Sequence, residues 1–427
     1  MSQGLFSSTD IDTGSRFLLK VLSQKWDEDL RQGRPLPETV LDAGCGIGVL
    51  GICAARALGS KPGLKVRAQD RDELARGFTE YNATRNGVPA SVLSAHTEPL
   101  LAADPPWDLI LSNIPAKTGE PVLLDFIARS AGLLSKEGSV MLVVVKPLSD
   151  LLRSRIRELK LPLFHEENGK EHTVLAYGGG VELNSVLNSD PQNSGDDFLK
   201  RRRVYFRCAG DFELEDIAYH IDAIHGVADF DTPSGVVQVA AKLVKRLALR
   251  PAAGPILVHE PDQGHFPAWL LRYRGAEPPG MPQSQTRTGP LVLSGRNILA
   301  LEAARQNSLL ALGDRVSGGK GASGIILAPA VDLFLDRERL SAAADQNREQ
   351  PGGGYSFIAL FPELVPQTNR LGAYWEGLAA LLTDGGMAVI ALPSSAAERF
   401  DREKPMGFTR LGDIKRQGFR ALGYERR

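Results

Sequence analysis

The strongest constraint on the fold is a regular alternation of short β-branched segments and longer amphipathic segments between Thr39 and Tyr177. This alternation is typical of repeated βα units around a parallel sheet. The segments expected to form strands are Thr39–Asp42, Lys65–Asp70, Ser91–Ser94, Asp108–Ser112 and Ser139–Lys146. The segments expected to form helices are Ile47–Leu58, Glu73–Arg85, Pro121–Leu134 and Leu148–Leu159. This order predicts an α/β domain with a mostly parallel sheet.

The end of this region departs from the βα pattern. Leu163–Glu167 and His172–Tyr177 flank the turn dipeptide Asn168-Gly169, which predicts a β-hairpin. We expect the hairpin to close the sheet with an antiparallel strand. The polar residues that follow, 184–200, are rich in turn formers and predict a linker.

Length and charge bound the number of domains and the kind of partner. At 427 residues the chain is longer than one ordinary domain. We therefore expect a first domain over residues 1–183 and a second over residues 201–427, on either side of the linker. With a net formal charge of −1 the chain has no strong overall attraction to nucleic acid, so RNA binding would need a local basic patch. The densest basic run, Lys200–Arg203, offers Arg201 and Arg202 as phosphate contacts, and the alternative is a solvated flank before a strand at Val204–Arg207.

Cysteine usage and the chain start predict the compartment. The cysteines, Cys45, Cys53 and Cys208, show neither a CxxC pair nor metal-ligand spacing. A reducing compartment without structural zinc is expected. Residues 1–10 lack a basic start followed by an apolar core, and no apolar run is long enough to span a membrane, so we expect a cytoplasmic protein.

The second half of the chain repeats the first in diverged form. Asp12-Thr13-Gly14-Ser15 reappears as Asp231-Thr232-Pro233-Ser234, and Val40–Gly46 aligns with Val258–Gly264. Further pairs in the same order are Leu74-Ala75 with Leu299-Ala300, Asn82 with Asn307, Leu133-Leu134 with Leu381-Leu382, Gly138 with Gly386, and Val174–Tyr177 with Ala421–Tyr424. This conserved order indicates two copies of one α/β domain.

The segment Asp42-Ala43-Gly44-Cys45-Gly46-Ile47-Gly48 joins an expected strand to an expected helix. Glycines there let the backbone turn sharply and approach a ligand, and the helix N-terminus offers free N–H groups. A dinucleotide fingerprint would have a glycine where Val49 stands. Asp42 would also bring negative charge close to a phosphate, so a cationic group, such as an ammonium or a sulfonium, fits this turn better.

Two further polar residues stand at the ends of expected strands. Asp70 stands where a carboxylate can accept both hydroxyls of a ribose, and the alternative is that Asp70 and Asp72 cap the next helix. Asn113, in Ser112-Asn113-Ile114-Pro115, stands at the same edge of the sheet, with a turn former as the alternative. The strand, glycine turn and acid that precede it favour a ligand site.

These residues resemble a known family. Asp42–Gly48 resembles motif I of class I S-adenosylmethionine-dependent methyltransferases, and Asp70 matches their ribose-binding acid. Asn113-Ile114-Pro115-Ala116-Lys117 falls where amino methyltransferases carry Asn-Pro-Pro and an aromatic or aliphatic residue. Gly4-Leu5-Phe6-Ser7, with Asp12-Thr13-Gly14-Ser15, is similar to the start of the small-domain enzymes that make N2-methylguanine in ribosomal RNA. Those enzymes are duplicated, with one active and one degenerate half.

The resemblance implies two tandem Rossmann-like methyltransferase domains, each with a mostly parallel seven-stranded sheet and a C-terminal antiparallel hairpin. It implies an S-adenosylmethionine-dependent N-methyltransferase that acts on a guanine N2 amine of ribosomal RNA, with RNA as partner and neither metal nor membrane. The residues implied to bind the cofactor are Phe6, Asp42, Gly44, Cys45, Gly46, Gly48, Asp70, Arg71, Ala95, His96 and Asn113. Those implied in catalysis are Asn113, Ile114 and Pro115. Substrate contacts are expected from Lys117 and, in the basic run, from Arg201 and Arg202.

Departures from the family motif keep alternatives open. Ile114 replaces the first proline, and Ala116 replaces the residue that stacks on the base. A methyltransferase acting on a protein side-chain amide is one alternative. A scaffold that binds the cofactor without turnover is another. For His96, a plain surface or helix-start histidine is the alternative to an adenine contact.

The second copy is expected to have lost the cofactor site. The alignment above places Asp262 at the position of Gly44, Phe266 at that of Gly48, Gly295 at that of Asp70 and Phe361 at that of Asn113. Phe266 would fill the space that the cofactor needs, and a glycine cannot bind a ribose. We therefore expect this domain to contribute to substrate binding or to structure.

Overall fold

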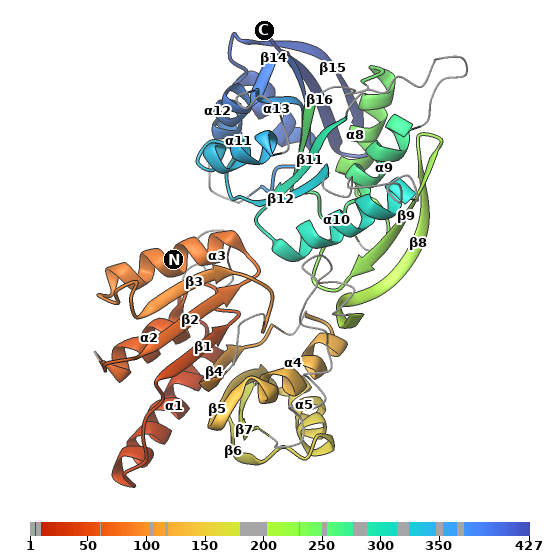
Figure 1. The fold of residues 1–427 in the computed structure, drawn as a ribbon. Coiled ribbons are helices and arrows are strands. Elements are labelled where there is room, and N and C mark those ends of the chain that lie inside the picture. The colour runs from red at the N-terminus through yellow and green to blue at the C-terminus, as the bar shows by residue number, and fades with distance from the viewer. Residues whose placement is uncertain are drawn as a thin grey trace. The chain divides into compact units, whose positions relative to one another are not determined.

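The structure is a computed structural model that describes residues 5, 10–59, 61–101, 106–115, 118–179, 203–229, 231–249, 254–275, 288–313, 324–346, 353–364 and 371–427. The chain divides into two compact units, Met1–Tyr205 and Phe206–Arg427 (Figure 1). The linker expected at residues 184–200 lies outside the described residues.

The first unit is one layer of sheet between helices. Its elements are α1 (Thr13–Arg31), β1 (Thr39–Ala43), α2 (Val49–Leu58), β2 (Lys65–Asp70), α3 (Glu73–Arg85), β3 (Leu93–Thr97), β4 (Trp107–Asn113), α4 (Glu120–Gly132), β5 (Leu134–Val145), α5 (Lys146–Glu158), β6 (Leu163–Asn168), β7 (His172–Gly178) and the short helix η2 (Arg203–Tyr205). They form a seven-stranded sheet in the order β3-β2-β1-β4-β5-β7-β6. The strands β1 to β5 pair in parallel, and β7 pairs antiparallel with both β5 and β6.

The second unit has the same sheet. Its elements are β8 (Phe206–Leu214), β9 (Ile217–Ile224), α8 (Gly235–Arg246), β10 (Gly254–His259), α9 (His265–Gly275), β11 (Thr288–Gly295), α10 (Ile298–Leu312), β12 (Ile325–Pro329), α11 (Arg337–Asp345), β13 (Tyr355–Leu360), α12 (Leu371–Leu381), β14 (Leu382–Pro393), α13 (Ser394–Arg402), β15 (Phe408–Arg416) and β16 (Phe419–Arg426). The sheet order β12-β11-β10-β13-β14-β16-β15 reproduces that of the first unit. The expected fold class, two tandem α/β domains with antiparallel C-terminal hairpins, is confirmed.

Some elements differ from the sequence prediction. Helix α1 was not expected as an element, although Leu18, Val21, Leu22 and Trp26 are buried at helical spacing along it. The expected strand Ser91–Ser94 lies later, at Leu93–Thr97, because Val92 N and Leu93 N instead donate to Pro89 O in a turn. The antiparallel β8–β9 pair that opens the second unit replaces the short strand expected at Val204–Arg207.

The core of the first unit lies on both faces of its sheet. Successive residues of β1 point to opposite faces, so Val40 packs with α1, α2 and α3, whereas Leu41 packs with α4 and α5. Both side chains have no exposed surface. A sheet buried on both faces fixes the carboxyl ends of β1, β2 and β4 at one edge, where the candidate residues lie.

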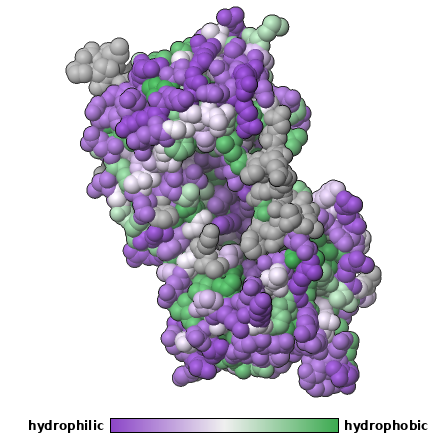
Figure 2. Space-filling view, turned by 180° about the vertical axis from the view of Figure 1, so that it is seen from behind, coloured by the Kyte–Doolittle hydropathy of each residue, from purple (hydrophilic) through white to green (hydrophobic). Residues whose placement is uncertain are grey.

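The surface is mainly polar. Figure 2 shows one face on which hydrophilic residues predominate and hydrophobic ones form small separate patches. The large hydrophobic side chains that are exposed come from separate elements of both units, among them Leu30, Tyr81, Leu335 and Met406. Among the described helices, none combines the length and the hydropathy that crossing a membrane requires.

Candidate active site

A glycine loop follows β1 in the first unit. Gly44, Gly46 and Gly48 adopt left-handed φ angles of 77°, 55° and 84°, a conformation that other residues rarely adopt. Gly44 N and Cys45 N both donate to Gln69 O, at 2.9 and 3.0 Å, which fixes the loop to the end of β2. A Cβ at Gly48 would lie 2.8 Å from Thr79 Cγ2, whereas a Cβ at Gly46 would meet nothing within 4 Å. The loop is therefore tightly packed at Gly48 and open at Gly46.

Helix α3 holds this loop from one side. The hydroxyl of Thr79 donates to Gly46 O at 3.1 Å, and Asn82 Nδ2 donates to Ile47 O at 2.9 Å. Cys45 Sγ lies 3.4 Å from Thr79 Oγ1. Thr79 was not identified from the sequence, and Asn82 was noted only as a marker of the repeat. A polar residue on the face that carries Ala75 and Ala83 was the available signal for Thr79.

Asp42 lies beneath the loop with no exposed surface. Its Oδ2 accepts from Gly51 N at 2.7 Å, and its Oδ1 has no hydrogen-bond partner among the described residues. Burial raises the pKa of Asp42 to about 7, although the Gly51 N–H opposes the shift. An unpartnered buried carboxylate oxygen beside a glycine loop suits a ligand that brings a hydrogen-bond donor or a positive charge.

Asp70 connects the end of β2 to the loop. Its Oδ2 accepts from Gly46 N and its Oδ1 from Asp72 N, both at 3.0 Å. Asp72, not Asp70, caps helix α3, by accepting from Leu74 N at 2.9 Å. Burial raises the pKa of Asp70. The Asp70 carboxylate accepts from the backbone N–H groups of Gly46, Asp72 and Arg71. A carboxylate has about four acceptor sites, so it retains capacity for a hydroxyl donor, as a ribose would supply.

Asn113 ends β4, and its side-chain orientation is fixed. Its Nδ2 donates to Asp12 Oδ2 at 2.7 Å and to Ser15 Oγ at 3.0 Å. Asn113 Oδ1 accepts no hydrogen bond from the described residues. Neither Asp12 nor Ser15 was assigned to the site from the sequence, because they lie about a hundred positions away along the chain.

The two residues after Asn113 contribute less than expected. The Ile114 side chain is 3 % exposed and packs in the core, so only its backbone can serve a ligand. Pro115 is exposed, and its carbonyl accepts from Thr118 N at 3.1 Å and from Thr118 Oγ1 at 2.6 Å. Of the three residues proposed for catalysis, Asn113 alone offers a polar side chain.

The remaining candidates lie along β3 or beyond the described residues. Ala95 and His96 pair in register with Ala68 and Gln69, one strand from the glycine loop. His96 Nε2 lies 3.0 Å from Ser94 Oγ, and burial together with nearby Arg67 lowers the pKa of His96. Arg71 follows Asp70 and is partly exposed. Phe6, Ala116, Lys117, Arg201 and Arg202 lie outside the described residues.

Leu100 is a neighbour of the loop that was not identified from the sequence. A Cβ at Gly44 would lie 3.4 Å from Leu100 Cδ2. The loop after β3 therefore supplies an apolar wall beside the glycines, and its distance from them in sequence left no local signal.

The second unit corrects the sequence alignment of its loop. In the loop after β10, the residues with left-handed φ angles are Glu260, Asp262 and Gly264, at 58°, 47° and 90°. Gly264 N donates to Pro261 O as Gly48 N donates to Cys45 O, and Asn307 Nδ2 donates to Gln263 O as Asn82 Nδ2 does to Ile47 O. Glu260, Asp262 and Gly264 thus correspond to Gly44, Gly46 and Gly48.

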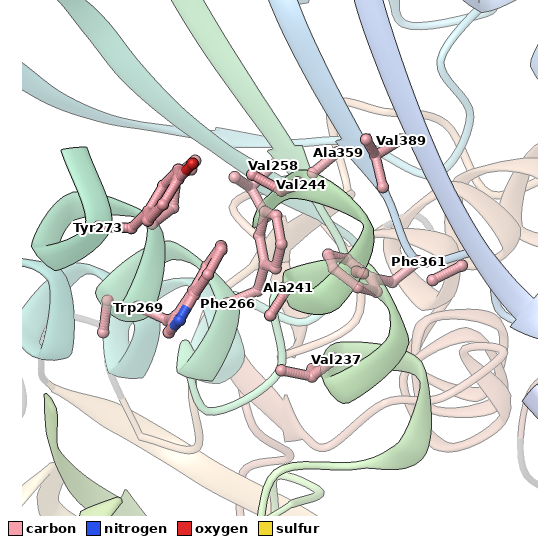
Figure 3. Packing of buried hydrophobic residues seen from close by; sticks show 14 of the residues in the cluster. Val237, Ala241, Val244, Val258, Phe266, Trp269, Tyr273, Ala359, Phe361 and Val389 are labelled. Atoms are coloured by element: carbon pink, nitrogen blue, oxygen red, sulfur yellow. The ribbon is translucent and has the colours of Figure 1, made fainter. Parts of the chain in front are cut away.

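The expected correspondences of Gly44 with Asp262 and of Gly48 with Phe266 are therefore wrong by two positions. Phe266 follows Gly264 by two residues within α9 and is fully buried. Its ring packs edge to face against the ring of Phe361, with 5.1 Å between the ring centroids, inside the cluster drawn in Figure 3. It fills the core and does not enter the loop.

The other two replacements occur where they were expected. Gly295 ends β11 as Asp70 ends β2, and Phe361 follows β13 where Asn113 ends β4. A Cβ at Gly295 would lie 2.8 Å from Glu260 Oε2, so the Glu260 carboxylate fills the space above this glycine. Glu260 Oε1 accepts from Arg296 N at 3.0 Å, and burial raises the pKa of Glu260 to about 8.

No group of three or more potential metal ligands comes together within the parts of the chain that the structure describes. At one edge of its sheet the first unit has a glycine loop that is open at Gly46, the Asp70 carboxylate and the oriented amide of Asn113.

The first part of the chain is similar to known methyltransferases. Residues 1–161 match the family model described as methyltransferase small domain. A ribosomal RNA small subunit methyltransferase C of Pseudomonas entomophila is 36% identical over 135 residues, which are 32% of this chain and 35% of the relative. A ribosomal protein L11 methyltransferase of Rhodopseudomonas palustris is 43% identical over 82 residues, which are 18% of this chain and 26% of that relative. The chain thus spans only about a quarter to a third of the length of these curated relatives.

One solved structure matches the whole fold. It is a Thermus thermophilus 16S rRNA N2-guanine methyltransferase in complex with AdoMet and guanosine. The TM-score is 0.59 with 16% identity, over 100% of this chain and 95% of that one. This likeness shows that both proteins share the two-unit fold. Over residues 1–161, this chain is similar to the methyltransferase small domain family.

Proposed function

We propose that the first unit binds S-adenosylmethionine and transfers its methyl group to the exocyclic N2 amine of a guanine in ribosomal RNA. The observation that carries this proposal is the oriented amide of Asn113, which leaves its oxygen as an acceptor at the same sheet edge as the glycine loop. The RNA acceptor named for one curated relative and for the solved structure supports it.

The residues of the first unit fit this cofactor. Gly46, with open space on its side-chain side, would allow the cofactor to approach the loop. Asp70 would accept from the ribose hydroxyls, and Asp42 would bring negative charge near the cationic part of the cofactor.

When bound, the cofactor supplies an electrophilic methyl group on a sulfonium. The chain then has to orient a weakly nucleophilic amine, because the amine lone pair is delocalised into the base. Asn113 Oδ1 and the Ile114 carbonyl would accept the two amine hydrogens and direct the lone pair toward the methyl group. Such alignment can supply roughly 7–11 kcal/mol of a barrier. No strong base is required, because the amine proton becomes acidic once the methyl group is attached.

Transfer of labelled methyl groups tests the acceptor. Labelled S-adenosylmethionine is incubated with the protein and a lysate from cells that lack this gene, and portions are then treated with ribonuclease or protease. Label released by ribonuclease supports the proposal. Label lost to protease favours a protein acceptor. The match to ribosomal protein L11 methyltransferases is the observation that supports this alternative. Cofactor binding without any transfer favours a scaffold.

The variant Asn113→Ala tests the proposed active site. We expect it to abolish transfer and to leave cofactor affinity unchanged, because Asn113 would bind the acceptor amine and Asp70 the cofactor. Transfer rates and equilibrium dialysis of the cofactor measure the two effects separately. Unchanged transfer by this variant would contradict the proposed role of Asn113.

We further propose that the second unit and the basic run contribute to RNA binding or to structure, and that the reaction takes place in the cytoplasm. Reversing Arg201 and Arg202 to Glu should weaken RNA binding without changing cofactor affinity. Filter binding over a range of salt concentrations measures this effect. If RNA affinity and its salt dependence stay the same, the basic run has no part in RNA recognition.

A further inference from the structure

We infer that Asp12 is a positioning residue for methyl transfer: its carboxylate holds the amide of Asn113 with the oxygen free for the acceptor amine. The inference rests on the proposed function, which assigns Asn113 but gives the segment Asp12-Thr13-Gly14-Ser15 no role. The observation behind it is that one oxygen, Asp12 Oδ2, accepts from both Asn113 Nδ2 at 2.7 Å and Ser15 N at 3.0 Å.

The chemistry of a carboxylate decides which way the amide faces. An ionised carboxylate only accepts hydrogen bonds, so the Asn113 atom that faces it must be the NH₂ group. The reversed amide would place two acceptor oxygens against each other. Donation to a negative charge also polarises the amide and makes its oxygen a stronger acceptor. Asp12 therefore favours the one orientation that can receive an amine hydrogen.

The fold places Asp12 rigidly enough for this role. Asp12 is the N-cap of α1, and this helix is anchored to β5 and β7 through Leu18, Val21 and Leu22, which are 0–2 % exposed. A Cβ at Gly14 would lie 2.9 Å from Asp12 Oδ2. The small residue at position 14 thus gives the carboxylate the room it occupies.

The second unit lacks both members of the pair. The position of Asn113 is occupied by Phe361, whose ring packs in the core. The helix that corresponds to α1 is α8, and its N-cap is Ser234, so the expected match of Asp12 with Asp231 is wrong by three positions. The buried Oγ of Ser234 has no hydrogen-bond partner within the described residues. If Asp12 served only as a helix cap, its replacement in the second unit would be independent of the replacement of Asn113. This joint absence is what a shared role of the two residues predicts.

Two substitutions that keep the helix cap separate positioning from stability. Serine and asparagine are both good N-caps, but serine is too short to reach Asn113, whereas asparagine retains an oxygen at the same distance. In Asp12→Ser, we expect kcat to fall roughly 10- to 100-fold, with cofactor affinity unchanged. In Asp12→Asn, we expect kcat within a few-fold of the unmodified protein. The probe is ribosomal RNA from cells that lack this gene, with labelled S-adenosylmethionine.

The matched control is Asp29→Ser on the same helix. Asp29 accepts from Arg34 Nε at 2.7 Å at the other end of α1, so its loss tests helix stability without touching Asn113. We expect a lower melting temperature with unchanged kcat. The inference is overturned if Asp12→Ser keeps the kcat of the unmodified protein, if Asp12→Asn loses as much as Asp12→Ser, or if Asp29→Ser loses kcat equally. Absence of transfer by the unmodified protein contradicts the proposed function instead.

Discussion

Asp42 is an acid that the fold buries with only one of its oxygens hydrogen-bonded within the described residues. A carboxyl group in that position is more easily accommodated when it is protonated, which is why its pKa is about 7 and not near the ordinary 3.8. Above the ordinary pKa this difference destabilises the folded state, because the unfolded chain ionises the group at lower pH. Its neighbour Asp70, also buried, adds to the shift through repulsion.

The pH dependence of stability should reveal this group. Between about pH 4 and about pH 7 the folded state binds one more proton at Asp42 than the unfolded state, so stability falls as pH rises. The fall from this group is roughly 4 kcal/mol and is complete above its folded pKa. In Asp42→Asn we expect that part of the pH dependence to vanish, as measured by denaturant unfolding across this range.

Asp262 provides the control for this measurement. Burial raises its pKa to about 7 as well, but it lies in the second unit. Asp262→Asn should also flatten the stability curve while leaving cofactor binding unchanged, whereas Asp42→Asn should weaken binding. Parallel pH curves for Asp42→Asn and the unmodified protein would show that Asp42 is ionised in the folded state at low pH.

The residues of the site were predictable from the sequence to the extent that the signal was local. The glycine loop follows a recognisable strand, and Asp70 and Asn113 stand at the carboxyl ends of two others, so their common edge could be inferred. Asp12 and Ser15 could not be assigned, because their contacts to Asn113 join segments far apart in the chain. The orientation of an amide is equally invisible without the neighbour that fixes it.

At the scale of the element, the glycine loop combines backbone conformation with access. Gly46 has a left-handed φ of 55° and open space where a side chain would be, so an alanine there would meet no protein atom within 4 Å. An alanine at position 46 costs stability because of its left-handed φ. If it also lowers the affinity for a ligand, the ligand must occupy the space beside Gly46. That property makes the position a direct probe of the proposed site.

We expect Gly46→Ala to destabilise the protein by roughly 1–2 kcal/mol, the cost of a left-handed alanine, and in addition to weaken cofactor binding. Gly63→Ala is the matched control, because Gly63 has a φ of 90°, also meets nothing within 4 Å, and precedes β2 at the end away from Asp70. It should lose similar stability and keep its affinity. Calorimetry of binding and unfolding checks both, and equal affinities in the two variants would mean that no ligand approaches Gly46.

The same element explains why the repeat was aligned two positions out of register. Matching by residue identity paired Gly46 with Gly264, since a glycine is the obvious partner for a glycine. The left-handed angles instead pair Gly48 with Gly264 and place Glu260 and Asp262 opposite Gly44 and Gly46. Glu260 and Asp262 share the left-handed conformation of Gly44 and Gly46 without being glycines, and matching by residue identity cannot detect that. Strand and helix order, which depends on hydrophobic pattern, was predicted closely.

At the scale of the whole molecule, the two units have kept one architecture and diverged in their sites. Both have the same strand order. In each unit an asparagine on a helix, Asn82 or Asn307, donates a hydrogen bond to the loop. The groups that would contact a ligand have not survived. Glu260 fills the space above Gly295, and Phe361 packs in the core beside Phe266 (Figure 3). In the second unit, side chains of the protein thus occupy positions that correspond to the candidate site of the first unit.

This divergence predicts one cofactor for each chain. Isothermal titration with S-adenosylmethionine should give a single site, and Asp70→Ala should remove all measurable binding, because Gly295 offers no second carboxylate for a ribose. Gly295→Asp should not create a site, since its Cβ would lie 2.8 Å from Glu260 Oε2 and bring a second carboxylate against a buried one. Two equivalents bound, or binding that persists in Asp70→Ala, would instead mean that Glu260 moves aside and that the second unit is a working site.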